Sequence, residues 1–168
     1  MSTNIILEID AADICERLVG ITPVYLQNFL QRGSYGLRSS VRPGLVRSQR
    51  RLFSREDVFG IALVWMLFEG GLRGDPLTRI LNDIAETRKA NPNLAAQKLL
   101  ESGAEYLVVV REPRAPTKRP LEKPDQKVET VHQSGIAEIV RQNPSADLLV
   151  IPIGRKFEDI RKRMEILF

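Results

Sequence analysis

Apolar residues recur at helical spacing over the first third of the chain. One stripe lies in residues 10–20 and a second in residues 23–33, and a short turn joins them. Asp10 precedes the first stripe as an acidic N-cap, while Thr22 and Pro23 are typical of an N-cap and a first helical residue. The residues of the two stripes are Ile14, Leu18, Val19, Leu26, Phe29 and Leu30. This pattern predicts a helix-turn-helix.

A basic segment without clear periodicity follows the second predicted helix. Residues 34–53 are rich in serine, glycine and arginine, with apolar residues spread among them. Pro43-Gly44 is a turn signal, because proline presets φ at the second turn position and glycine tolerates a positive φ at the third. These features predict a β-hairpin, or wing.

The next predicted helix, over residues 55–69, is apolar on almost every side. Ser54 is placed to cap it, and Asp57 follows three residues later, as in a capping box. One apolar face is enough for a helix beside a single core. This helix must therefore be covered on more than one side, either by the C-terminal part of the chain or by a second subunit.

The rest of the chain changes from helices to a mixture of helices and strands. Start signals at Asp75-Pro76 and Asn91-Pro92 predict two helices, the second ending at Gly103. Apolar runs and helical periodicity then predict further strands and helices. The strands are expected at 106–110, 128–132 and 148–153, and the helices at 136–141 and 157–167.

Together these elements predict an α+β protein in three parts. Residues 1–85 form the winged helix-turn-helix, residues 86–104 a connecting helix, and residues 105–168 a small α/β domain for dimerisation or partner binding. Four prolines in residues 112–127 predict an irregular loop inside the last part.

The composition is that of an ordinary folded protein and leaves few residues for catalysis. The chain has 168 residues, of which 43% are hydrophobic and 27% charged, so a packed core can form. Cys15 is the one cysteine and His132 the one histidine. An intramolecular disulfide and an all-cysteine metal cluster cannot form, and metal-hydrolase or Ser-His-Asp chemistry has few candidates. We expect no enzyme activity, no metal and no cofactor.

No segment has the length of a membrane span. The longest apolar run, 61–68, holds eight residues, whereas a spanning helix needs about 20. The first residues lack the basic stretch that precedes the apolar part of a signal peptide. These observations predict a cytoplasmic protein without a membrane partner.

The positive charge is concentrated in one segment. The formal net charge is +4, yet residues 17–55 hold eight arginines, no lysine and no acidic residue, so this segment carries +8 and the remainder −4. Guanidinium groups suit two-point contact with phosphate or guanine, which favours a nucleic-acid-binding face. A solvated basic face, or a seat for an acidic partner surface, is the alternative.

Several short motifs lie in order over residues 10–81. They are Ile21-Thr22-Pro23 with Leu26, Gly33, Arg51-Leu52-Phe53-Ser54 with Asp57-Val58, Gly71-Leu72 and Ile80-Leu81. In this order they resemble the MerR family of winged-helix DNA-binding proteins. The resemblance implies that Arg51 contacts the phosphate backbone and that Val24, Tyr25, Gln27 and Asn28 face DNA from the recognition helix.

The residue types on the second helix predict what it contacts. Gln27 and Asn28 can each bond bidentately to an adenine edge, although solvated amides are the alternative. The candidate DNA-contacting residues of helix and wing are Thr22, Val24, Tyr25, Gln27, Asn28, Gln31, Arg32, Arg38, Arg42, Arg47, Arg50 and Arg51.

The function predicted from these observations is sequence-specific binding of double-stranded DNA, as a transcriptional regulator. A homodimer is expected because two-fold operators need one, with helices 55–69 and 157–167 as candidate surfaces. One alternative is a protein-interaction or assembly module that uses the winged helix as a scaffold. Another is a small-ligand-binding α/β regulator with residues 113–127 as a lid, and the effector of the C-terminal part, small molecule or protein, stays open.

Overall fold

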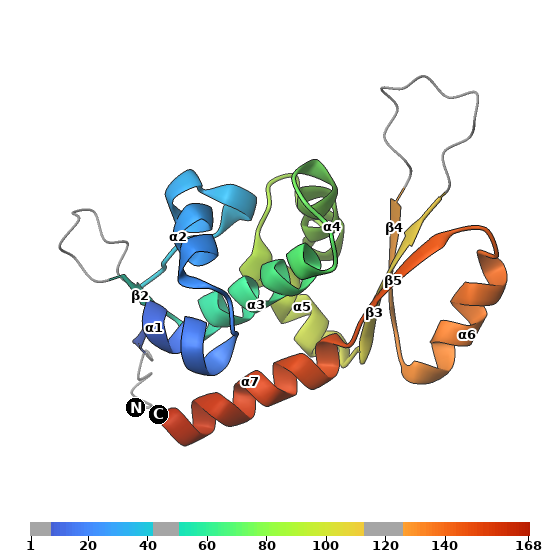
Figure 1. Cartoon of the computed structure of the whole chain (residues 1–168). Coiled ribbons are helices and arrows are strands. Elements are labelled where there is room, and N and C mark those ends of the chain that lie inside the picture. Colours follow the sequence, from blue (N-terminus) through green and yellow to red (C-terminus); the bar gives the residue numbers. More distant parts are fainter. Residues whose placement is uncertain (1–7, 42–50, 113–125) are drawn as a thin grey trace.

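The computed structural model describes residues 8–41, 51–112 and 126–168 and combines a helical part with a three-stranded sheet (Figure 1). The elements of the helical part are β1 (Ile9–Asp10), α1 (Ala11–Asp13), the π-helix η1 (Ile14–Leu18), α2 (Pro23–Arg32), the 3-10 helix η2 (Ser34–Gly36), β2 (Leu52–Phe53), α3 (Arg55–Glu69), α4 (Asp75–Ala85) and α5 (Pro92–Ser102). The elements that follow are β3 (Tyr106–Arg111), β4 (Gln126–Val131), α6 (Gln133–Gln142), β5 (Asp147–Ile151) and α7 (Ile153–Leu167). The mixed α+β character is as predicted.

The first helix is less regular than its sequence predicts. The Asp10 carboxylate accepts a hydrogen bond from the Asp13 N–H at 2.9 Å and so caps α1. From Ile14 onward the backbone widens, and the Val19 N–H donates to the Ile14 carbonyl at 2.9 Å, five residues back. One α-helical turn thus continues as η1 instead of as an α-helix to Gly20.

A short sheet joins the start of the predicted helix-turn-helix to the end of the predicted wing. Strand β2 pairs with β1 in antiparallel register, with Ile9 opposite Phe53. Both side chains are fully buried, so the pairing is also a core contact. The turn at Pro43-Gly44 lies outside the described residues, and the hairpin itself stays a prediction.

The larger sheet is antiparallel, with strand order β4-β3-β5. The central strand is buried on both faces: Leu107 and Val109 join the main core, while Val108 and Val110 pack with Ile139 of α6. The α/β label predicted for residues 105–168 is therefore wrong, because α/β sheets are built from parallel strands joined by crossover helices.

Helix α3 lies in the middle of the helical part (Figure 1) and has the bounds that the sequence predicts. Its apolar residues are covered within the chain, by α5 on one side and by α7 on another. The apolar face of α7 is likewise buried, through Phe157, Ile160 and Met164. Both surfaces predicted for dimerisation are thus occupied by the chain's own packing.

One hydrophobic core crosses both predicted domain boundaries. It extends from Ile9 through the helices to Leu107 of β3 and Met164 of α7. The helical part and the sheet are therefore packed as neighbours in a shared core.

Several boundaries in the C-terminal part differ from the prediction; helix α6, for example, begins at Gln133, three residues before its predicted start. The apolar run predicted as a strand over 148–153 ends at Ile151, because Pro152 has no N–H for the sheet ladder. Ile153 instead begins α7, four residues before the predicted start, and is fully buried there. The irregular loop predicted over 112–127 is also shorter, since β4 begins at Gln126.

Candidate nucleic-acid interface

Helix α2 presents a polar, exposed side to solvent. Pro23 begins the helix, and Gly33 ends it with a φ of 59°, in the left-handed region. Leu26 and Phe29 are buried on the opposite side. The exposed residues here that were predicted to contact DNA are Thr22, Val24, Gln27, Asn28, Gln31 and Arg32. The structure brings these six together on one accessible part of the molecule, α2 and its N-cap.

Tyr25 differs from its neighbours on α2. Its side chain is 38% exposed, and its ring packs against three others. The centroid distances are 6.0 Å to Phe29, 5.4 Å to Trp65 and 5.2 Å to Phe68. Tyr25 therefore holds α2 against α3, and just its outer part is available to a partner.

This aromatic cluster extends beyond α2 and α3. Phe29 makes an edge contact with Tyr35, whose hydroxyl accepts a hydrogen bond from the Gly74 N–H at 3.1 Å. The Arg73 guanidinium lies 4.4 Å from the centroid of the Phe68 ring, a cation–π contact. The cluster consists of Tyr25, Phe29, Tyr35, Trp65 and Phe68. It ties α2 both to α3 and to the start of α4.

Of the five arginines predicted for the wing, two lie in the described residues. Arg38 is exposed and Arg51 is half-buried. The Ser39 hydroxyl donates a hydrogen bond to the Leu52 carbonyl. This bond joins the base of the wing segment, defined as residues 34–53, which are predicted to form the wing. The remaining three, Arg42, Arg47 and Arg50, lie outside the described residues.

The buried carboxylate of Asp57 binds the base of the wing segment at both of its ends. Asp57 is 1% exposed, and its Oδ2 accepts hydrogen bonds from the Ser40 N–H at 2.9 Å, the Ser40 hydroxyl at 2.6 Å and the Ser54 N–H at 2.9 Å. Its Oδ1 accepts a hydrogen bond from the Asn93 amide at 2.8 Å. Asp57 thus links both ends of the wing segment to α3 and α5.

The C-terminal helix α7 is attached to η1. Arg163 of α7 directs its guanidinium at the end of η1, with Nη1 3.3 Å from the Arg17 carbonyl oxygen and 3.4 Å from that of Leu18. A cation at a helix C-terminus stabilises the carbonyls that lack an intrahelical partner. Helix α7 therefore fixes η1 in place.

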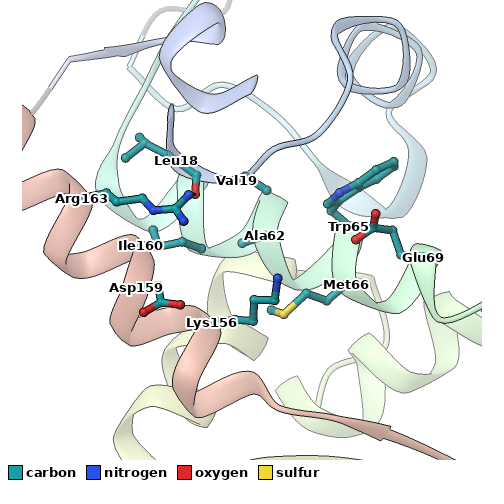
Figure 2. Close-up of a pocket in the computed structure, with 10 residues that line it drawn as sticks. All are labelled: Leu18, Val19, Ala62, Trp65, Met66, Glu69, Lys156, Asp159, Ile160 and Arg163. Atoms are coloured by element: carbon teal, nitrogen blue, oxygen red, sulfur yellow. The ribbon is translucent and has the colours of Figure 1, made fainter. Parts of the chain in front are cut away.

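A small pocket lies beside this attachment, between η1, α3 and α7 (Figure 2). Trp65 and Glu69 line it from α3, and Lys156 and Arg163 line it from α7. Its volume is about 60 Å³, whereas sites for small organic ligands have about 300–1,000 Å³. It has room for a few water molecules.

The cysteine and the histidine lie apart. Cys15 is buried in η1, and His132 is exposed at the start of α6. Within the described ranges, no three His, Cys, Asp or Glu side chains are grouped so that they could hold a metal ion. No helix there has both the length and the hydropathy of a membrane span.

Two sets of contacts that support the candidate interface could not be predicted from the sequence. Asp57 was predicted to belong to a capping box, but its partners Ser40 and Asn93 lie 17 and 36 residues away. Arg163 lies 145 residues from Leu18. Local sequence patterns carry no signal for pairs of residues so far apart. An acidic residue, Asp57, inside an almost fully apolar helix is the sequence feature that points to buried hydrogen-bond partners.

No family model matches the chain, and no curated protein sequence matches it either. The MerR-like character of residues 10–81 therefore stays a resemblance carried by its motifs. The exposed side of α2, its aromatic support and the base of the wing segment are the observations from which a function can be argued.

Proposed function

We propose that the protein binds double-stranded DNA through α2 and acts as a transcriptional regulator. The observation that carries the proposal is the exposed side of α2. It presents the side-chain amides of Gln27, Asn28 and Gln31 and the guanidinium of Arg32, while the opposite side of the helix is buried. A helix with polar side chains on its accessible side suits the major groove, which is about 12 Å wide.

The residues of α2 fit base contacts of different kinds. Gln27 and Asn28 can each donate to and accept from an adenine edge, and Val24 can contact a thymine methyl group. Arg32, at the end of the helix, can bind guanine or a phosphate. Each good bidentate contact contributes about 1–3 kcal/mol of discrimination against the wrong base.

The arginines that follow α2 are proposed to contact phosphates. Arg38 and Arg51 lie near the two ends of the wing segment, and Arg42, Arg47 and Arg50 lie between them. Phosphate contacts position a protein on the duplex without specifying sequence. In a plot of the logarithm of the binding constant against the logarithm of the salt concentration, each phosphate contact adds about −0.9 to the slope.

The first experiment is selection of bound sequences from random duplex DNA, followed by titration of the selected site at several salt concentrations. We expect enrichment of an adenine-containing motif and a steep salt dependence. Asn28→Ala should lose about 1–3 kcal/mol of discrimination at one position and keep the salt slope. Gln142→Ala, which removes an exposed amide of α6, is the matched control.

A second variant tests the wing. Arg50→Ala with Arg51→Ala should reduce affinity for all sequences alike and flatten the salt slope by about 1.8. Binding that ignores salt, or that is unchanged in this double variant, contradicts the proposed mechanism. Failure of the selection to enrich any sequence contradicts sequence-specific recognition.

We also propose that the DNA-bound form is a homodimer, because a two-fold operator presents two equivalent half-sites. Light scattering should then give twice the mass of the chain. A stable monomer at micromolar concentration, with and without DNA, would contradict this part of the proposal.

A second candidate function is an assembly module that binds another protein through α2. It is favoured by Val24, which is 67% exposed, and by the exposed part of Tyr25, because exposed apolar and aromatic side chains are common in protein interfaces. A pull-down that enriches one acidic protein after nuclease treatment, and that Val24→Ser abolishes, would favour this function over DNA binding.

A further inference from the structure

A broad groove lies beside the C-terminal end of α2, between the residues that follow this helix and the connection between α4 and α5. Its volume is about 750 Å³. One wall is formed by the residues after α2, including Gly36 and Arg38, and the other by the connection between α4 and α5, including Arg88 and Lys89.

The groove is strongly basic. Arg38, Arg88 and Lys89 are its charged lining residues, and all three are exposed. In the described part of the chain, none of the three has an acidic side chain within ion-pair distance. The acid next to this loop, Glu86, is bound instead to Lys98 at 2.7 Å. Three cations thus face a groove without local neutralisation.

The two walls are fixed to each other. Gly36 has a φ of 75°, and a Cβ placed there would lie 2.1 Å from the Ala90 carbonyl oxygen, so the two backbones are in direct contact. Within the second wall, the Thr87 hydroxyl donates to the Lys89 carbonyl at 2.9 Å. Asn91 then caps α5 by accepting from the Leu94 N–H at 3.1 Å. The cations are therefore carried on an ordered loop.

We infer that this groove binds the phosphate backbone of the same duplex whose major groove receives α2. The inference rests on the proposed function and extends its contact surface to Arg88 and Lys89. Charge complementarity favours a polyanion. Leu37, the large apolar residue of the lining, is buried, so the groove lacks the exposed apolar anchor typical of a protein interface. Strongly positive surfaces are typical of DNA interfaces.

The test compares two double variants on the selected duplex over a range of salt concentrations. Arg88→Gln with Lys89→Gln removes the proposed contacts. Arg155→Gln with Lys156→Gln removes the same two residue types, also adjacent and exposed, from α7 outside the groove. We expect the groove variant to flatten the salt slope by about 1.8 relative to the parent and to keep its base preference. The control variant should change the slope much less.

The outcomes separate this inference from the proposed function. If the parent binds DNA and the groove variant flattens the slope no more than the control, the groove inference is wrong and DNA binding through α2 stands. If the parent binds no DNA, both are wrong. Binding of polyglutamate that depends on Arg88 and Lys89, without DNA binding, would assign the groove to an acidic protein. Equal thermal midpoints of the two variants exclude unfolding as the cause.

Discussion

Asp57 is the residue at which the polar contacts below the wing segment meet. A charge removed from water is costly unless it is fully hydrogen-bonded, and this carboxylate accepts four hydrogen bonds from donors on three different segments. Because donors point at both Oδ1 and Oδ2, residue 57 needs a hydrogen-bond acceptor at both positions. An isosteric amide cannot provide this, because one of its two polar groups is a donor.

Asp57→Asn should therefore lower the free energy of unfolding by about 3 kcal/mol. The new NH₂ group would face the donors of Ser40 and Ser54 or that of Asn93. Chemical denaturation measures the loss. Asp83→Asn, on the exposed side of α4, is the matched control and should change stability by less than about 0.5 kcal/mol. Equal effects of the two substitutions would show that the buried network adds no stability.

Cys15 makes stability depend on pH. Burial, followed by the nearby Glu16 carboxylate, raises the pKa of the Cys15 thiol. A group with a raised folded-state pKa contributes stability that is fully present below its unfolded pKa, roughly 8.5 for cysteine, and is lost as the pH rises toward the folded value. The denaturation midpoint should fall more between pH ~7 and pH ~10 in the parent than in Cys15→Ala. Equal falls would contradict this role of the thiol.

At the scale of the elements, the segment after α2, which contains η2, has two adjacent residues in the left-handed region of φ. Tyr35 and Gly36 both have a positive φ, at 59° and 75°. Tyr35 keeps this conformation with the help of its contact to Phe29 and its hydrogen bond from Gly74. The loop thereby brings Gly36 against Ala90 and sets the position of the second basic wall.

Gly36→Ala and Gly33→Ala form a matched pair for this loop. Both glycines have a positive φ, but a Cβ at Gly33 would meet no atom within 4 Å. Gly33→Ala should therefore cost about 1–2 kcal/mol, the strain of a left-handed alanine. Gly36→Ala adds a collision with backbone and should cost at least about 1–3 kcal/mol more. Thermal or chemical denaturation compares them, and equal losses would show that the contact with Ala90 is unimportant.

The starts of α2, α3 and α5 were predictable because they carry local chemical signals. Ser54, Pro23 and Asn91-Pro92 place helix starts at the observed residues, since each acts through its own backbone or side chain within one turn. The widening into η1 carries no such signal. The Asp57 network was also beyond prediction, because its partners are brought together by tertiary packing. On α2, periodicity separated the exposed side from the buried one, but it could not show that Tyr25 packs on α3.

At the scale of the whole molecule, the helical part, the sheet and α7 share one hydrophobic core. Phe157 of α7 is 2% exposed and makes an edge contact with Phe59 of α3, with ring centroids 5.4 Å apart. Covering α3 therefore requires a helix from the far end of the chain. Trp65, on the same α3 helix, can report optically on the helical part.

Phe157→Ala should lower the free energy of unfolding by about 3–5 kcal/mol. If the core is one cooperative unit, Trp65 fluorescence and far-ultraviolet circular dichroism should shift together by the same amount. Phe168→Ala, which removes a 55% exposed ring at the end of the same helix, should change stability by less than about 0.5 kcal/mol. Two separate transitions in Phe157→Ala would instead support independent domains.

The attachment of α7 to η1 and α3 also sets the time at which the fold can be completed during biosynthesis. The ribosome adds about 5–20 residues per second, so roughly 5–20 s pass between the emergence of the end of α3 and that of the end of α7. Over that interval the side of α3 that α7 covers stays exposed, and exposed apolar surface is the condition in which nascent chains need chaperones. Because Arg163 also caps η1, a nascent chain without α7 lacks one of the contacts that hold the proposed DNA-reading helices in place.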